Sequence, residues 1–456
     1  MSRPQSEAEH LARMVPPSVA ATSFNRRALL RAGAGLGAAA GGAVLLSACG
    51  GSDSGGTASA SSAAGAPSSV GGGEVTFGSN QSDEVPKKGY QAMADAYKAA
   101  SGTTVKINTV EHNAFQENIN SYLQGKPDDV FTWFAGYRMR FFASKGLAGD
   151  VSDVWAQLQG YTDGFKTAST GDDGKQYFVP VSYYPWAVFY RPSVWKEKGY
   201  EVPKTLDELK TLGAKMQKDG LVPIAFGDKD GWPAMGTFDI LNMRINGYQF
   251  HVDLMAHKAP WDDPKVKKVF STWAELLPLH QADPLGRTWQ EAAQALQTKK
   301  AGMYLLGLFV TQQMTANLDD VDFFTFPEID SAIGSDALDA PSDGFMMAKK
   351  PSDEARAKAL LTWLGSKDAA NTLVKNDPTT LVANSGADVS GYSALNKKAV
   401  ELVGSAKNIA QFLDRDSRPD FASTAVIPGI QAFLKNPKDI DGVCKSLEQQ
   451  AKSIFV

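Results

Sequence analysis

The first half of the chain alternates between short apolar runs and amphipathic segments. Runs rich in β-branched and aromatic residues predict strands at 74–78, 103–110 and 129–134. Apolar residues at helical spacing, as at Tyr90, Met93, Ala94 and Tyr97, predict helices at 86–100, 114–123 and 138–145. Strands that alternate with helices in this way indicate an α/β fold with a parallel, doubly wound sheet.

A second set of elements follows a stretch that looks like a crossing between two lobes. Residues 174–181 lead into an apolar run at 186–191, which we interpret as a strand that enters a new lobe. The pattern predicts further helices at 205–218, 236–247, 264–277 and 289–299 and strands at 301–306, 323–327 and 344–348. We expect 329–342 to be a polar loop and 352–456 to be mostly helical.

The N-terminal segment has the order of parts that an exported lipoprotein needs. Arg26 and Arg27 precede an apolar run at 32–48, which is typical of the bacterial twin-arginine export route. The run is too short and too rich in Gly and Ala for a membrane span. It leads into residues 46–50 (LSACG), which resemble a lipobox where Cys49 is acylated. The alternative is a simple signal-cleavage site beside an incidental cysteine.

The rest of the chain divides into a tether and a globular part. Residues 50–73 are almost all Gly, Ser and Ala, so they cannot bury a core and predict a flexible tether. Roughly 380 residues remain beyond it, too many for one comfortable core, which favours two lobes. The expected organisation is a signal, a tether, lobe 1, lobe 2, a return to lobe 1 and C-terminal helices of lobe 2, with the respective bounds 1–48, 49–73, 74–182, 183–304, 305–350 and 351–456.

Composition narrows the classes of partner. A hydrophobic content of 43% and a charged content of 21% are ordinary for a soluble protein, and the formal net charge of −4 argues against nucleic acid as a partner. Beyond the tether, Cys444 is the single cysteine, and no two of the five histidines have metal-binding spacing on a helix. We therefore expect no disulfide, metal or cofactor. Cys444 fits a buried apolar position, although a dyad with a histidine stays open.

Several loosely defined motifs occur in a fixed order behind the lipobox. They lie at 174–181 (GKQYFVPV), 187–196 (AVFYRPSVWK), 203–209 (PKTLDEL), 299–304 (KKAGMY), 307–309 (GLF), 326–327 (FP) and 343–348 (DGFMMA). Together they resemble the family 1 extracellular solute-binding proteins over about residues 74–370. Phe309 stands where that family usually has Trp, so the aromatic ring is kept and the indole N–H is lost.

The resemblance implies a two-lobed, periplasmic-binding-protein-like fold whose lobes close on a ligand by hinge motion. It implies that the ligand is a carbohydrate and that the closed form docks on the permease of an ABC importer. We expect an extracytoplasmic monomer that contacts the membrane only through its lipid anchor.

A sugar site needs flat aromatic rings for the C–H faces of the sugar and acids, amides or Arg for its hydroxyls. Open α/β sheets bind ligands beyond the ends of their strands. The aromatic candidates in such places are Trp133, Tyr137, Tyr183, Tyr184, Trp186, Trp232 and Phe309. Core packing is the alternative for each of them. Because side chains alternate along a strand, only one of Trp133 and Phe134 faces the core, and we predict that Trp133 reaches the site.

The candidate carboxylates are Asp83, Glu111 and Asp343, which follow or begin predicted strands. Asp83 fits a helix N-cap equally well. The turn-rich loop at 227–233 contains a D-x-D-G pattern, but Pro233 occupies the position where a calcium loop needs its sharp-turn glycine. We expect Trp186 and Trp232 on one lobe and Glu111 and Trp133 on the other.

Two rival functions remain from the sequence. A secreted glycoside hydrolase needs two carboxylates across one sugar, and sequence spacing neither supports nor excludes such a pair. The chain has no fingerprint of a nucleophile elbow, a metalloprotease or a P-loop. A structural or adhesion lipoprotein would have no cleft between closing lobes. We therefore expect a binding protein and not an enzyme.

Overall fold

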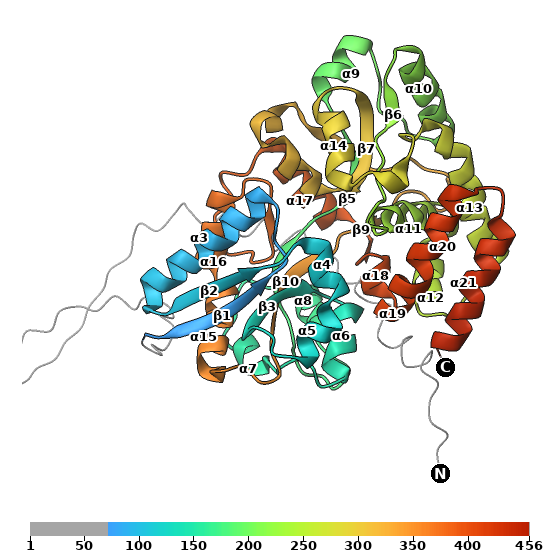
Figure 1. The fold of residues 1–456 in the computed structure, drawn as a ribbon. Helices are drawn as coiled ribbons and strands as arrows, with labels where there is room; N and C mark the ends of the chain where they lie inside the picture. Colours follow the sequence, from blue (N-terminus) through green and yellow to red (C-terminus); the bar gives the residue numbers. More distant parts are fainter. Residues whose placement is uncertain (1–71, 456) are drawn as a thin grey trace, which may run out of the picture.

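Two β-sheets organise the computed structural model, which describes residues 72–455 (Figure 1). The first lobe has a six-stranded sheet in the order β11–β4–β10–β3–β1–β2. The second lobe has a four-stranded sheet in the order β6–β7–β5–β8. Arg26, Arg27 and Cys49 lie outside the described residues. No helix within 72–455 combines the length and apolar character that a membrane crossing requires.

The first sheet is mixed rather than wholly parallel. Its strands are β1 (Glu74–Ser79), β2 (Thr104–Thr109), β3 (Val130–Phe134), β4 (Val179–Tyr183), β10 (Ser342–Met347) and β11 (Leu381–Val382). β1, β2 and β3 pair in parallel, as the alternation of strands and helices predicted. β10 runs antiparallel to both β3 and β4, and β11 runs antiparallel to β4. The expectation of a parallel sheet is wrong here because β10 arrives from the second lobe, not through a βαβ crossover.

Amphipathic helices cover the first sheet. α3 (Glu84–Ser101) buries the predicted face of Tyr90, Met93, Ala94 and Tyr97 and ends at Gly102, whose positive φ of 75° suits glycine. The helix predicted at 114–123 is broken at Asn118 into α4 (His112–Glu117) and α5 (Ile119–Gln124). The remaining helices of this part are α6 (Tyr137–Ser144), α7 (Ser152–Trp155) and α8 (Asp163–Ala168).

The second sheet consists of β5 (Trp186–Tyr190), β6 (Val222–Ile224), β7 (Ala301–Gly307) and β8 (Asp322–Phe324). β5 runs antiparallel to β7 and β8, and β6 runs parallel to β7. The helices in this stretch are α9 (Pro192–Lys198), α10 (Leu206–Lys218), α11 (Pro233–Asn246), α12 (Tyr248–Met255), α13 (Pro264–Leu276) and α14 (Trp289–Gln297), with 3₁₀ segments η1 (Leu277–Leu279), η2 (Pro284–Gly286) and η3 (Leu308–Asp320). α11 is buried along most of its length, which makes it the central helix of the lobe.

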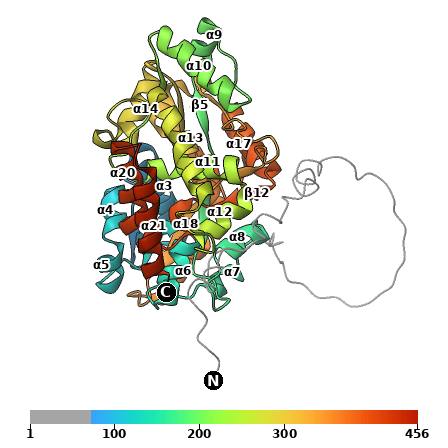
Figure 2. The ribbon, with the colours of Figure 1, turned by 90° about the vertical axis from the view of Figure 1, so that its right-hand side faces the viewer.

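The C-terminal part serves both lobes. α15 (Glu354–Leu364) and α16 (Lys367–Asn376) pack on α3 of the first lobe, whereas α20 (Ile427–Lys435) and α21 (Ile440–Ile454) lie beside α11 and α13 of the second (Figures 1 and 2). The other elements are α17 (Ala394–Ser405), α18 (Leu413–Asp416), α19 (Pro419–Phe421) and the π-helical turn η4 (Ala422–Val426). The expected assignment of 351–456 to lobe 2 alone differs from this packing.

The segment 305–350 also contributes to both lobes. β8 pairs with β5 in the second sheet, whereas β10 pairs in the first. The predicted polar loop at 329–342 contains a further strand, β9 (Ala337–Asp339), which pairs in parallel with β12 (Asn408–Ala410). The chain crosses between the two sheets at residues 184–185, and β10 returns it to the first.

Candidate functional site

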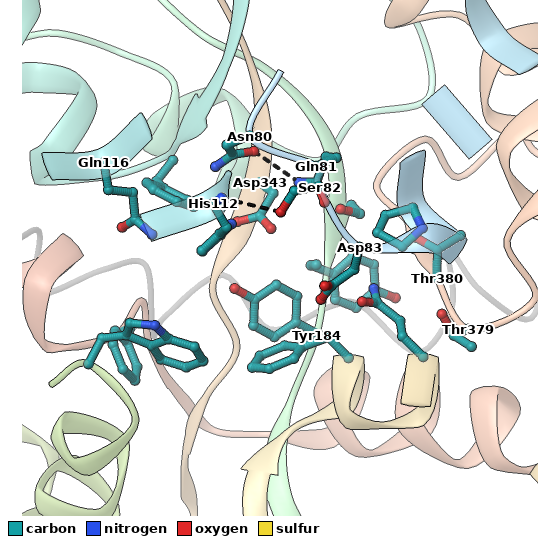
Figure 3. Close-up of a pocket in the computed structure, with 18 of the residues that line it drawn as sticks. Asn80, Gln81, Ser82, Asp83, His112, Gln116, Tyr184, Asp343, Thr379 and Thr380 are labelled. Carbon is teal, nitrogen blue, oxygen red and sulfur yellow. Dashed lines mark hydrogen bonds between the residues drawn. The ribbon is translucent and has the colours of Figure 1, made fainter. Parts of the chain in front are cut away.

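A cavity of about 1140 Å³, including the solvent at its mouth, lies between the lobes. On the first lobe it is lined by the loop after β1, by α4, by the end of β3 and by β10. On the second lobe it is lined by the start of β5, the loop before α11, α14, η3 and α18. Asp83, His112, Tyr184 and Asp343 face this space from four separate parts of the chain (Figure 3).

The loop after β1 supplies a row of polar side chains, as expected where parallel strands end. These are Asn80, Gln81, Ser82 and Asp83 (Figure 3). Gln81 donates from Nε2 to Oδ1 of Asn80 at 3.2 Å, and the backbone N–H of His112 donates to Oγ of Ser82 at 3.2 Å. The buried Nδ2 of Asn80 has no hydrogen-bond partner among the protein atoms, so it is free to donate to a bound solute.

Burial shifts the pKa of two groups on this wall. It lowers the pKa of His112 to about 4, so the imidazole is neutral at physiological pH. Burial also raises the pKa of Asp83, against the effect of a hydrogen bond with Gln290 on α14. Asp83 occupies the N-cap position of α3, yet its side chain makes no capping hydrogen bond. Its carboxyl is therefore available to the cavity and to the opposite lobe.

Arg415 joins the two lobes at the base of the cavity. Its Nη1 lies 2.9 Å from Oδ1 of Asp343 on β10, and its Nη2 donates to the hydroxyl of Tyr184 at 2.8 Å. Burial by itself lowers the pKa of Arg415, but Tyr184, Asp343 and Asp414 together raise it above its ordinary value. The guanidinium is therefore a fixed, charged donor, and each of its partners also lines the cavity.

A second guanidinium, that of Arg138, also lies against the Phe134 ring. Nη1 of Arg138 lies 2.9 Å from Oδ2 of Asp414 and donates to Oε1 of Gln116 at 2.7 Å. The Phe134 ring has Arg138 at 4.8 Å and Arg415 at 4.2 Å from its centroid, both within cation–π range. Both arginines are buried and paired with a carboxylate, so this wall presents polar groups without an unpaired cation.

The second lobe presents a cluster of aromatic rings to the cavity. Phe309 is at its centre, with ring centroids 5.1 Å from Tyr184, 5.8 Å from Trp232 and 5.2 Å from Trp289. Trp186 lies beside it and stacks on Phe412 at 4.9 Å. Trp232 and Phe309 keep part of their surface exposed to the cavity, so they offer ring faces to a ligand.

Most of the residues predicted from the sequence meet at this cavity. Those that line it are Asp83, Tyr183, Tyr184, Trp186, Trp232, Phe309 and Asp343. Glu111 does not line it, because its carboxylate caps α4 by accepting from the backbone N–H groups of Asn113 and Ala114.

The two aromatic candidates after β3 also lie elsewhere. Trp133 is 1% exposed and packs against Phe115 and Phe142, while its neighbour Phe134 takes the place at the cavity. The prediction that Trp133, and not Phe134, reaches the site is therefore wrong. All five residues of β3 are buried, so the alternation of side chains does not reveal which face of the strand meets the cavity. Tyr137 is buried beside Phe141 in α6.

Several lining residues were missed by the sequence reasoning. They include Asn80, His112, Gln116, Phe134, Arg138, Trp289, Gln290, Phe412, Asp414 and Arg415. The acidic and basic run at 414–416, which directly follows the apolar Phe412 and Leu413, is a local signal for Asp414 and Arg415. Among residues 72–455, no group of three or more His, Cys, Asp or Glu side chains is placed to hold a metal ion. Cys444 is buried, as expected, and burial raises the pKa of its thiol to about 12.

Comparison with solved structures places this architecture among solute receptors. The bacterial solute receptor AcbH, described as having an exclusive substrate preference for β-D-galactopyranose, has a TM-score of 0.83 and 47% sequence identity, covering 85% of this chain and 100% of that one. A chitin oligosaccharide binding protein has a TM-score of 0.75 at 20% identity, covering 84% of this chain and 99% of that one.

Sequence comparison finds relatives of the same class, namely binding proteins for solutes. An uncharacterised ABC transporter extracellular-binding protein of Pyrococcus horikoshii is 23% identical over 369 residues, which cover 78% of this chain and 79% of that protein. An alpha-glucosides-binding periplasmic protein of Rhizobium meliloti is 27% identical over 191 residues, which cover 39% of this chain and 41% of that protein. The model of the bacterial extracellular solute-binding proteins matches residues 81–371. The chain therefore belongs to the bacterial extracellular solute-binding protein family.

Proposed function

We propose that this protein captures a neutral hexopyranose between its lobes and delivers it to the permease of an ABC importer. The observation that carries the proposal is the pairing of two unlike walls around one cavity. The aromatic cluster of the second lobe faces the polar groups of the first, among them Asn80, Asp83 and Asp343. A pyranose has the same two-sided character, with apolar C–H faces and a rim of hydroxyls.

The likeness to AcbH narrows the solute to be tested first. That receptor shares 47% of its residues with this chain over its entire length and is described by its preference for β-D-galactopyranose. β-D-Galactopyranose is therefore the first candidate. The aromatic rings supply stacking faces, while Asp83, Asp343 and Asn80 supply acceptors and a donor for the hydroxyls.

Arg415 gives the polar wall its geometry. Because Asp343 and Tyr184 both bind its guanidinium, their oxygen atoms are held in place before a solute arrives. Such preorganisation reduces the conformational entropy lost on binding. The site is proposed to bind and release its solute intact, as a receptor for a permease requires, and to work as a monomer without a cofactor.

The N-terminal segment supports a finer proposal on location. The family is extracellular, and the order of twin arginines, apolar run, LSACG and polar tether supports export through the twin-arginine route followed by acylation of Cys49. A tether of Gly, Ser and Ala would leave the lobes free to move near the membrane surface.

Changing both Arg26 and Arg27 to Lys tests the proposed twin-arginine export route. Export should stop, because Lys does not replace the planar guanidinium, and normal export of the double variant would point to the general secretory route.

A titration with D-galactose tests the main proposal. The intrinsic tryptophan fluorescence should change saturably, since Trp186, Trp232 and Trp289 all line the cavity. The melting temperature should rise, because a ligand at 100 times its dissociation constant stabilises the folded state by about 2.7 kcal/mol. No response to galactose or other neutral hexoses would contradict the proposal. New reducing ends from a galactoside substrate would instead indicate a glycoside hydrolase.

A further inference from the structure

The short helix α18 and the residue before it carry two of the groups that shape the cavity. Phe412 stacks on Trp186 with its ring centroid at 4.9 Å and an interplanar angle of 26°. Arg415 holds Asp343 and Tyr184. A helix of four residues has little stability of its own. The position of both groups therefore depends on whatever fixes this turn to the rest of the lobe.

Phe412 has a backbone conformation that ordinary residues avoid. Its φ of 122° and ψ of 145° lie in a region that is essentially reserved for glycine. A residue remains in such a conformation only when its surroundings hold it there, and conformations of this kind gather at ligand-binding sites. The strain is at the residue where the chain turns into α18, and the ring of this residue stacks on Trp186 at the cavity.

A carboxylate from another helix holds this turn. Oδ2 of Asp239, on α11, accepts the backbone N–H of Leu413 at 2.7 Å, and Asp239 is fully buried. The other hydrogen bonds of the backbone at 411–416 are local, since Oδ2 of Asp416 accepts the N–H of Gln411 and the carbonyl of Phe412 accepts from Arg415 and Asp416. The side chains of Asp414 and Arg415 bond outside the turn, to Arg138, Asp343 and Tyr184. Asp239 is thus the side chain that ties the turn to α11, whose N-cap residue is Trp232 at the cavity.

We infer that Asp239 is a positioning residue for solute binding. By accepting the N–H of Leu413 it holds Phe412 in its strained conformation, and it thereby keeps the Phe412 ring and the Arg415 guanidinium in the cavity wall. It also makes α11 a rigid link between that wall and Trp232. The inference rests on the proposed sugar-binding function, but the hydrogen bond that carries it is measurable without a ligand.

The surroundings of Asp239 indicate which substitutions are informative. Its Oδ1 has no hydrogen-bond partner within the described chain and lies 3.8 Å from Nδ1 of His251 on α12. Burial, followed by the charges of Asp339 on β9 and of Asp416 and Asp414 on α18, raises the pKa of Asp239 well above its ordinary value. A carboxamide has nearly the same shape as this side chain and also offers an oxygen acceptor. Asp239→Asn keeps an acceptor oxygen, and Asp239→Leu has a similar shape without one.

The experiment compares these two variants in D-galactose binding and in amide hydrogen exchange over 411–416. We expect Asp239→Leu to bind galactose about ten- to a hundredfold more weakly and to exchange the Leu413 amide at least about tenfold faster. Asp239→Asn should restore most of the affinity and protection. Asn242→Leu is the matched control, because Asn242 is buried one turn further along α11 and bonds to His251 and Asn246 instead of α18. It should lower the melting temperature and leave the affinity unchanged.

The outcomes separate the inference from the proposed function. The inference would be overturned if Asp239→Leu and Asp239→Asn bound galactose with affinities within about twofold of each other and exchanged their amides over 411–416 at equal rates. If the Leu variant does not fold, the wild type alone decides. Exchange of the Leu413 amide as slow as that of the buried amides of α11 would support the inference, and exchange as fast as in exposed loops would overturn the inference. If the wild type binds no sugar, the proposed function fails, and the exchange measurement still decides the role of Asp239.

Discussion

The indole Nε1 of Trp232, in the second lobe, donates a hydrogen bond at 3.2 Å to Oδ1 of Asn113 on α4 of the first lobe. The Trp232 ring also meets His112 edge-on at 6.5 Å. This direct contact joins the two walls of the cavity, so we expect it to favour closure of the lobes and thereby solute binding.

Asn113→Ala should shift the protein toward the open arrangement. The loss of one interlobe hydrogen bond, worth about 0.5–1.5 kcal/mol, should weaken galactose binding by roughly two- to tenfold. Calorimetric titration measures the affinity, and solution scattering measures the radius of gyration, which should increase. Asn120→Ala is the control, because Asn120 is exposed on α5. Equal affinities for both variants would show that the contact does not contribute to closure.

Trp232 itself combines a ring face with this hydrogen bond, and two substitutions separate the contributions. Trp232→Ala should weaken binding by roughly ten- to a hundredfold, because it removes an aromatic contact with the solute that is worth about 1–3 kcal/mol. The melting temperature of the empty protein should change little. Trp232→Phe keeps a ring and should lose about as much as Asn113→Ala. Trp261→Ala provides the contrast, because Trp261 is 0% exposed in the core and its loss should cost about 3–5 kcal/mol of stability. A large fall in melting temperature for Trp232→Ala with normal binding would place Trp232 in the core instead.

The charges at the cavity predict discrimination against acidic sugars. Arg138 and Arg415 are already paired with Asp414 and Asp343, and Asp83 adds a further carboxyl. A uronate carboxylate would lose its hydration and find no unpaired cation on this wall. Galacturonate should therefore bind at least about tenfold more weakly than galactose in parallel calorimetric titrations at neutral pH. Equal affinities would indicate that one of the two arginines leaves its partner for the solute.

Asp228, in the loop before α11, predicts a measurable dependence of stability on pH. Burial raises its pKa to about 7, against a value of about 3.9 in an unfolded chain, while its Oδ1 accepts the N–H of Ala234 at 2.8 Å. Because the folded state binds this proton more tightly, the contribution of Asp228 to stability is full below about pH 4 and is lost as the pH rises through about 7.

Asp228→Asn isolates that contribution. Burial lowers the pKa values of His112, His251 and His280 to about 4, so these residues make the protein more stable as the pH rises. Both proteins contain the three histidines, so their effect cancels when the variant is compared with the wild type. The variant should melt at a higher temperature than the wild type at pH 8, and the difference should shrink by pH 5. Asp95→Asn, at an exposed position of α3, serves as the control. A difference that is the same at both pH values would contradict the assignment of the raised pKa to Asp228.

Cys49 gives a prediction about the anchor. If residues 46–50 are a lipobox, Cys49→Ala removes the sulfur that is acylated, and the protein should appear in the soluble extracellular fraction. Fractionation followed by immunoblotting measures this, and metabolic labelling with a fatty-acid analogue should mark only the wild type. Membrane retention of the variant at the wild-type level would rule out lipid anchoring through Cys49.

The sequence by itself was sufficient for features that depend on local order. The first three strands and α3 follow from the spacing of apolar residues, because burial of one helix face or one strand imposes that spacing. Tyr184, Trp186, Trp232 and Phe309 could be placed at the site, since they occur where strands end or where the chain crosses between lobes.

Only the tertiary structure decided which distant residues complete the site. Arg415 lies 72 residues from Asp343 and 231 from Tyr184 in the chain, and no local pattern encodes a pairing over such separations. The choice between Trp133 and Phe134 also required the fold, because β3 is buried on both faces. The direction of β10 and the strained conformation of Phe412 are set by contacts between lobes and helices, which form only when the whole chain has packed.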